Sequence, residues 1–220
     1  MKIKISIIIN LLIFVLMIFG LMVALLGIPF LQEGSKSNFL NLIKYFTVES
    51  NIFMGITALI FAINEILYIK KGKKINKIIF ILKYVSTVCV AITFFTVVFF
   101  LAPLVYRDRA LTMFTGINFF YHVAIPVLSI IVFILFENSN QYNIKITIFG
   151  MILFLIYSIF YLIASLTHIE DGKIIDGYDW YGFLKFGIPM FFLLMVLMLV
   201  LSYSISFLLY YINKKLFKEN

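Results

Sequence analysis

A group of polar residues able to do chemistry interrupts an otherwise apolar stretch of this chain. Residues 45–51 read Tyr-Phe-Thr-Val-Glu-Ser-Asn, which places a charge, two hydroxyls and an amide within five residues of one another. Such groups are costly in hydrocarbon unless a protein interior or a water-filled cavity receives them. A second polar residue, His122, lies in a later apolar stretch. A lone intramembrane histidine is uncommon, so we expect His122 to belong to a functional site.

Threonine and histidine together offer nucleophilic catalysis. A threonine hydroxyl is a weak nucleophile until a base removes its proton, and a neutral imidazole is well suited to do so near neutral pH. A pair formed by Thr47 and His122 could attack an ester carbonyl, with His122 taking and then returning the proton. Asn51 and Asn118 are candidate donors to the developing oxyanion, and Ser50 is a further candidate for contact with the substrate.

The same residue types also have a structural interpretation. Threonines in membrane helices usually hydrogen-bond to their own backbone or join helices, and Thr93 and Thr96 lie at comparable depth. Spacing alone favours that interpretation for Thr47. Ser165 and His168 form a second pair, which we interpret as a helix end in contact with water.

Composition places these residues in a membrane protein. Hydrophobic residues make up 64% of the 220-residue chain and charged residues 13%, whereas a soluble domain is roughly half apolar and a quarter charged. The net charge is +8, but the lysines fall in short loops between apolar runs, which indicates membrane orientation and not nucleic-acid binding. The single cysteine, Cys89, is expected to be a packing residue. With only two histidines in the chain, we expect neither a metal site nor a cofactor.

Six continuous apolar segments predict an all-α fold. We expect one domain over residues 1–220, formed by a bundle of six transmembrane helices. Each segment is long enough for the roughly 20 residues of a membrane crossing, and none alternates as a barrel strand would. The first is too long for the apolar region of a signal peptide. The expected spans are approximately 5–30, 40–69, 78–102, 114–136, 144–167 and 183–212.

The distribution of lysine and arginine orients the bundle. The more basic side contains both termini, so we expect the N- and C-termini to be cytoplasmic. Its basic residues are Lys2, Lys4, Lys70, Lys71, Lys73, Lys74, Lys77, Lys145, Lys214, Lys215 and Lys218. The other side has Lys36, Lys44, Arg107, Arg109, Lys173 and Lys185. That outer side also holds an acidic loop, with Glu170, Asp171, Asp176 and Asp179, and the aromatic residues Tyr178, Trp180 and Tyr181, which fit an interfacial belt.

Thr47 and His122 are expected at similar depth from the outer side. Thr47 lies seven residues into its expected span, ~10 Å at the rise of an α-helix, and His122 lies eight residues into another, about 12 Å. Helical phase places Asn51 on the face of Thr47, and Asn118 on the face of His122. We therefore expect the two faces to line a cavity that is open toward the outer leaflet.

Three charged residues inside the expected spans need separate explanations. Glu49 points roughly opposite Thr47, and the sequence identifies no partner for it. Glu65 and Lys83 both lie near the cytoplasmic end of their spans. We expect them to form a structural ion pair or to extend toward the interface.

The chain resembles the androgen-induced and androgen-dependent TFPI-regulating family of six-helix membrane hydrolases and its bacterial relatives. The resemblance lies in the six expected spans, in residues 45–51 on the second, and in residues 122–126 on the fourth, which read His-Val-Ala-Ile-Pro. It implies hydrolysis of fatty acid esters of hydroxy fatty acids through an acyl-threonine at Thr47, with His122 as the base. The family's acidic residue at the end of this span is similar to Glu137. The resemblance also implies a lipid substrate. The abundant Ile, Lys, Asn and Phe suit an AT-rich genome, so we expect a bacterial cytoplasmic membrane.

A function of another class fits the same residues. A six-helix protein that binds or transports a small molecule, such as the substrate-capture subunit of a vitamin importer, would use the cavity without any chemistry. A structural membrane protein with buried polar contacts is a third interpretation. The sequence leaves the oligomeric state, the acyl chain and the leaving group open.

Overall fold

The six membrane-spanning helices expected from the sequence are present. The structure, a computed structural model, describes residues 1–30, 36–105, 107–139, 142–170, 173–175 and 177–218. Asp171 and Asp176 of the acidic loop lie outside these residues. The helices long and apolar enough to cross a membrane are Lys2–Leu26, Phe46–Lys71, Lys77–Leu104, Ile117–Phe136, Ile144–Leu166 and Ile188–Phe217. This confirms the predicted all-α membrane fold.

Several of the spans are built from more than one helical segment. The spans comprise α1 (Lys2–Leu26), α3 (Phe46–Lys71), α4 (Lys77–Thr96) with η1 (Val97–Val105), α5 (Ile117–Phe119) with η3 (Phe120–Ala124) and α6 (Ile125–Phe136), η4 (Ile144–Ile148) with α7 (Phe149–Leu166), and α8 (Ile188–Lys218). The connecting elements are α2 (Phe39–Ile43), η2 (Arg107–Phe114), η5 (Phe183–Phe186), and an antiparallel hairpin of β1 (Ile169–Glu170) and β2 (Lys173–Ile174).

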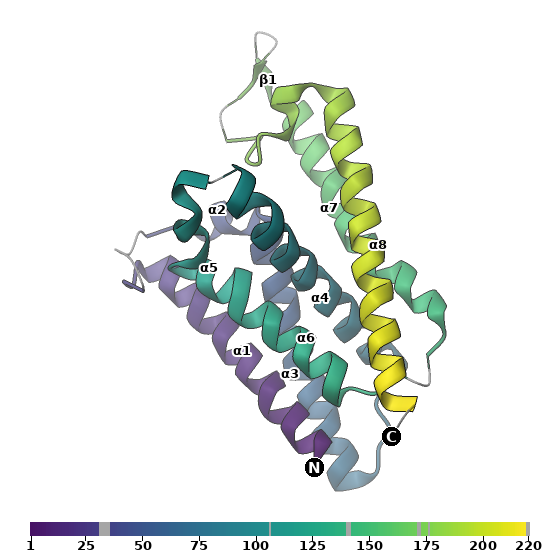
Figure 1. The fold of residues 1–220 in the computed structure, drawn as a ribbon. Helices are drawn as coiled ribbons and strands as arrows, with labels where there is room; N and C mark the ends of the chain where they lie inside the picture. The colour runs from purple at the N-terminus through teal and green to yellow at the C-terminus, as the bar shows by residue number, and fades with distance from the viewer. Residues whose placement is uncertain (31–35, 106, 140–141, 171–172, 176, 219–220) are drawn as a thin grey trace.

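Helix α4 is the centre of the bundle. Every residue from Lys83 to Thr93 is buried, so this part of the helix is covered on all sides. It packs against α3 and α6 on one side and against α7 and α8 on the other. Figure 1 shows α1, α3 and α6 grouped together, with α7 and α8 forming a separate pair. Both termini lie at one end of the bundle, here called the termini end, and the β1–β2 hairpin lies at the other, the hairpin end.

The second span begins later than the sequence suggested. A short helix, α2, ends before Lys44, and Tyr45 has an extended backbone (φ −87°, ψ 129°) that caps α3. Thr47 therefore lies in the first turn of α3 and not seven residues inside a helix. Glu49 lies in the same turn with an exposed side chain. A carboxylate is favoured there because the first turn carries the positive end of the helix dipole.

The expected ion pair of Lys83 with Glu65 is wrong, because Lys83 pairs with Glu137. Its ammonium lies 3.2 Å from Oε1 of Glu137, and both side chains are fully buried. Glu137 directly follows α6, which packs against α4, so the pair joins the third span to the end of the fourth. The Asn10 amide of α1 donates to the same carboxylate oxygen over 2.9 Å. Glu65 of α3 lies near both charges and interacts with them electrostatically.

Substitution of Lys83 by methionine should strongly destabilise the bundle. Removing one partner of a buried ion pair leaves the other charge uncompensated, at a cost of about 3–5 kcal/mol. We expect that loss in the free energy of unfolding of Lys83→Met measured in mixed detergent micelles. The double variant Lys83→Met/Glu137→Gln should recover part of it. Lys77→Met, at the exposed start of the same helix, is the control and should change little. Equal stability of the Lys83 and Lys77 variants would contradict the structural role of the pair.

Candidate active site

Thr47 lies in the first turn of α3, and two of its own polar groups are not used in hydrogen bonds within the described structure. The carbonyl of Tyr45 accepts hydrogen bonds from the backbone N–H groups of Val48 (2.9 Å) and Glu49 (3.2 Å). The N–H of Phe46 donates to the Tyr181 hydroxyl over 3.0 Å. Among the described residues, neither the backbone N–H nor the hydroxyl of Thr47 has a hydrogen-bond partner. Both groups are therefore available to a ligand.

Asn51 ties the Thr47 turn to the segment that carries His122. Its Nδ2 donates to the carbonyl of Thr47 over 2.7 Å and to the carbonyl of Tyr121 over 3.0 Å. Ser50 also donates to the Thr47 carbonyl, over 3.1 Å. Asn51 is fully buried, and its bond to Tyr121 is made away from water. The two bonds hold Thr47 at a fixed height relative to His122.

His122 lies in a π-helical turn, η3, in front of a proline. Pro126 has no N–H to donate back to His122, so the regular hydrogen-bond series is interrupted at this point. The N–H of Ile125 instead bonds to the carbonyl of Phe120, which is the π-helical spacing. Single π turns inside α-helices occur frequently at functional sites.

The neighbouring Tyr121 fixes this turn against α1. Its hydroxyl donates to the carbonyl of Met17 over 3.0 Å. Its ring packs on Gly20, where an added Cβ would lie only 2.7 Å from a ring carbon. The glycine thus allows the close approach that holds the His122 turn in place.

The ring of His122 has a defined tautomer. Nδ1 lies 2.7 Å from the carbonyl oxygen of Met113 in η2. Because a carbonyl only accepts, Nδ1 must carry a hydrogen, and in the neutral imidazole Nε2 then keeps its lone pair. No described residue bonds to Nε2. The bond to Met113 therefore orients the ring so that its neutral form presents Nε2 as a possible general base.

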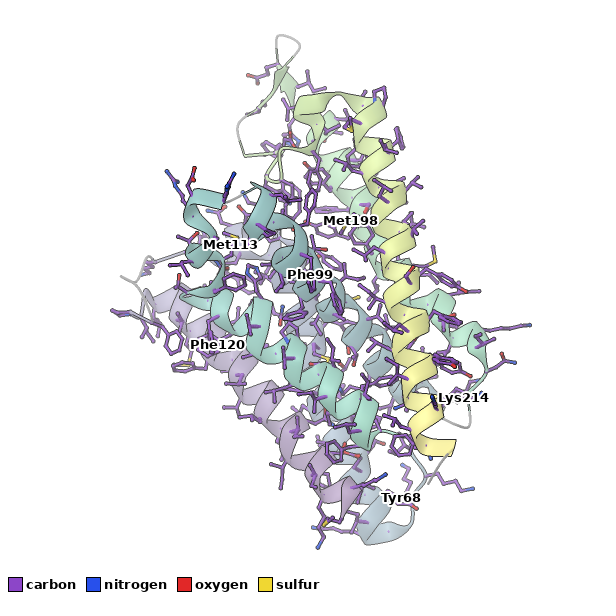
Figure 2. All side chains as sticks on the ribbon, viewed as in Figure 1. Tyr68, Phe99, Met113, Phe120, Met198 and Lys214 are labelled. Atoms are coloured by element: carbon purple, nitrogen blue, oxygen red, sulfur yellow. The ribbon has the colours of Figure 1, made fainter. Side chains whose placement is uncertain are left out.

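Thr47 and His122 line the same cavity, at the hairpin end of the bundle. It has a volume of about 710 Å3, within the range usual for small-molecule sites. We call it the Thr47–His122 cavity. Its lining residues are Leu42, Tyr45, Thr47, Val48, Phe100, Leu101, Met113, Ile117, Asn118, Tyr121, His122, Trp180, Tyr181, Gly182, Phe183, Met190 and Leu194. Figure 2 labels Met113, whose carbonyl orients the histidine.

A second cavity of about 500 Å3 adjoins the first and is lined mainly by apolar side chains. We call it the phenylalanine cavity. It lies between η1, α7 and α8, and Figure 2 shows Phe99 and Met198, which line it from η1 and α8. Residues common to both cavities are Thr47, Phe100, Leu101, Tyr181, Phe183 and Leu194. Thr47 therefore lies where the more polar of the two cavities meets the more apolar one.

A group of hydrogen-bonded aromatic residues covers Thr47 from the hairpin end. The Tyr157 hydroxyl donates to the carbonyl of Lys44 over 2.6 Å and accepts from Nε1 of Trp180 over 3.0 Å. Tyr181 lies beside them and lines both cavities. Burial raises the pKa of Tyr181 well above its ordinary value, so its hydroxyl stays protonated and can donate.

Sequence reasoning missed this use of the aromatic residues before the last span. Trp180 and Tyr181 were interpreted as an interfacial belt, yet both line the Thr47–His122 cavity. One residue in the sequence does indicate this role for the aromatic residues. Tyr157 places a hydroxyl inside an apolar span, and a buried tyrosine hydroxyl usually needs a hydrogen-bond partner.

The other candidate residues occupy different positions. Asn118 lines the Thr47–His122 cavity and donates to the carbonyl of Thr112 over 3.0 Å. Asn51 and Ser50 line neither cavity, and Ser50 bonds to Thr93 of α4 over 3.3 Å. Of the three, Asn118 is the one placed to reach a ligand.

The pair of Ser165 and His168 lies outside both cavities. The Ser165 hydroxyl is bonded to the carbonyls of Tyr161 (2.9 Å) and Tyr178 (2.8 Å). The His168 ring is stacked on Tyr178 with 3.5 Å between the ring centres. These contacts serve to fix the loop after α7.

No known protein family, curated protein or solved structure matches this chain.

Replacing Asn51 by alanine should destabilise the protein. The buried carbonyl of Tyr121 would lose its amide partner, and an orphaned buried polar group costs about 1–3 kcal/mol. Asn64→Ala is a matched control, because Asn64 makes the equivalent bond to the carbonyl four residues earlier (2.8 Å) at an exposed position of the same helix. We expect that control to change the free energy of unfolding by less than about 0.5 kcal/mol. If both variants unfold alike in detergent, Asn51 does not link α3 to η3.

Proposed function

We propose that this protein is a membrane-embedded hydrolase of lipid esters, with Thr47 as nucleophile and His122 as general base. The observation that carries the proposal is the cavity that both residues line. Thr47 brings a hydroxyl without a described partner, and His122 brings a ring whose Nδ1 is already bonded to the carbonyl of Met113. Hydrogen bonds between catalytic groups are often absent or long before substrate binds.

The reaction divides into two steps. In the first, Nε2 of His122 takes the proton of Thr47, and Oγ1 forms a bond to the ester carbonyl carbon. The resulting tetrahedral species collapses with cleavage of the bond to the alcohol oxygen, which receives the proton from His122. In the second step, His122 removes a proton from water, and the hydroxide attacks the acyl-threonine. The carboxylic acid leaves, and the proton returns to Thr47.

The start of α3 supports stabilisation of the oxyanion. The N–H of Thr47 has no partner among the described residues and lies at the positive end of the α3 dipole. A backbone donor of this kind is worth about 3–4 kcal/mol when it is aimed at the developing charge. The second amide hydrogen of Asn118 is a further candidate donor, because the first is bonded to the carbonyl of Thr112.

The two cavities support a substrate with an apolar chain and a more polar ester end. In the proposal the phenylalanine cavity holds the acyl chain, and the Thr47–His122 cavity holds the ester and the leaving alcohol. Fatty acid esters of hydroxy fatty acids have this character, since both parts are long-chain lipids. Given the lysine distribution, the substrate reaches the site from the outer leaflet of a bacterial cytoplasmic membrane.

Reaction with a fluorophosphonate probe tests the nucleophile. The probe should label the wild-type protein at Thr47, because the phosphorus atom bonds to Oγ1 as fluoride leaves. Thr47→Ala and His122→Ala should each lose labelling, measured by intact mass. Thr96→Ala is the control, since Thr96 lines the phenylalanine cavity alone and should leave labelling intact.

Full labelling of both variants would refute the proposed pair. An unlabelled wild-type protein that still binds a small molecule in the cavity would instead favour the binding or transport function. Thr47 and His122 would then be ligand contacts.

Filling the phenylalanine cavity should shorten the acyl chain that the protein accepts. Ser158 lines this cavity and is 7% exposed. In Ser158→Phe, the clash between the new ring and a bound acyl chain should cost about 1–3 kcal/mol, which is a loss of roughly 5- to 150-fold in kcat/KM for a palmitoyl ester. A butyryl ester should be hydrolysed as before. Ser204→Phe is the control, because Ser204 makes the same type of backbone bond (2.8 Å) on the exposed side of α8. Equal loss for both esters would place the acyl chain elsewhere.

A further inference from the structure

A buried polar cluster lies toward the termini end of the bundle, remote from Thr47 and His122. It consists of Ser6 and Asn10 of α1, Glu65 of α3, Lys83 of α4 and Glu137 after α6. Each of these side chains is at most 2% exposed. Asn10 donates to Ser6 (3.2 Å) and to Glu137 (2.9 Å), and Ser6 is hydrogen-bonded to Glu65. The cluster therefore joins four helices.

The charges of this cluster do not balance if every group is ionised. Lys83 supplies one positive charge, which the carboxylate of Glu137 compensates at 3.2 Å. Glu65 would add a second negative charge near the first. An uncompensated buried charge costs several kcal/mol even after relaxation, so such a group takes up a proton instead.

The hydrogen bonds of the cluster are also incomplete. Oδ1 of Asn10, Oε2 of Glu65 and Oε2 of Glu137 are buried without a hydrogen-bond partner, and so is the Lys83 ammonium, which lies beside Glu137 as an ion pair. The three oxygen atoms are acceptors, and Oε2 of Glu65 belongs to the carboxyl group that Lys83 does not pair with. One added hydrogen supplies a donor and removes the excess charge at the same time.

We propose that this cluster is a proton-binding site, with one exchangeable proton held by Glu65 near neutral pH while Glu137 stays ionised against Lys83. The groups that interact with Glu65 from the packed helices are Ser6 of α1, Lys83 of α4 and Glu137 at the end of α6, and Asn10 of α1 joins Ser6 to Glu137. Of these, the carboxylate next to the ammonium is the one that remains charged. The proton completes the contact of α3 with α1 without adding charge to the core.

A proton fits this site better than a metal cation. Oxygen atoms without partners are also ligands for sodium, but the Lys83 ammonium already lies against Glu137 and repels a second cation. Among the described residues, no group of three acidic, histidine or cysteine side chains is arranged to hold a metal ion.

Infrared spectroscopy in an ester-free maltoside detergent tests the proposal. The carbonyl stretch of a protonated carboxylic acid is separate from carboxylate bands and shifts on deuteration. The wild-type protein should show one such band near neutral pH, and Glu65→Gln should lose it. Glu137→Gln should lose it too, because Glu65 then becomes the carboxylate that ionises beside Lys83. Glu170→Gln, at an exposed residue of the hairpin, should keep it.

Stability provides an independent measurement. Glutamine has the shape and neutrality of a protonated glutamate, so Glu65→Gln should unfold at the wild-type temperature. A large drop, or failure to fold, would mean that ionised Glu65 is needed beside Lys83 and would overturn the proposal. A wild-type spectrum without the acid band would also overturn it. So would a band that disappears on addition of sodium chloride in place of potassium chloride, which would identify a sodium site.

Discussion

The ion pair between Lys83 and Glu137 is the contact on which the arrangement of this bundle depends. Hydrocarbon provides no hydrogen bonds, so a charge inside the membrane must find its partner in the protein. An ammonium on the central helix restricts the bundle to packings that bring a carboxylate to it. The pair together with Asn10 sets the rotation and the height of α1, α4 and α6 at once. Apolar side chains alone can slide past one another at much lower cost.

The same cluster has consequences at the opposite end of the molecule. Glu65 and Thr47 lie on one helix, α3, about 27 Å apart at the rise of an α-helix. Glu137 and His122 likewise belong to one span, α5–η3–α6, separated by about 22 Å. Two rigid segments thus run from the polar cluster to the proposed catalytic residues. Because the cluster fixes these two segments at the termini end, it helps to set the relative height of Thr47 and His122 at the other end. Near the site, the hydrogen bonds of Asn51 to the carbonyls of Thr47 and Tyr121 also fix this height.

Interruptions of helix geometry then shape the site itself. The span of His122 contains a π turn, the span of α4 ends in the π-helical segment η1 with Pro103 inside it, and α3 starts after an extended residue. Each interruption lies at the hairpin end. Irregular backbone at membrane depth is tolerated where it is buried in protein or lines a cavity. Here it leaves the two groups that the proposed reaction needs, the Thr47 N–H, which has no partner among the described residues, and the oriented imidazole of His122.

The sequence by itself determined the membrane class, the six spans and the two residues most worth examining. Long apolar runs have few alternatives to a spanning helix, and polar residues such as Thr47 and His122 are conspicuous against them. Only the tertiary structure decided the partner of Lys83, the separation of α2 from α3, and the place of Tyr181 beside Thr47. Lys83 and Glu137 are far apart in the chain, and the break between α2 and α3 is held by contacts of Lys44 and Phe46 with the distant Tyr157 and Tyr181. All of these contacts depend on which helix faces which. Local periodicity gives the face of a helix but not its neighbour, because hydrophobic faces of similar width can pack in several arrangements.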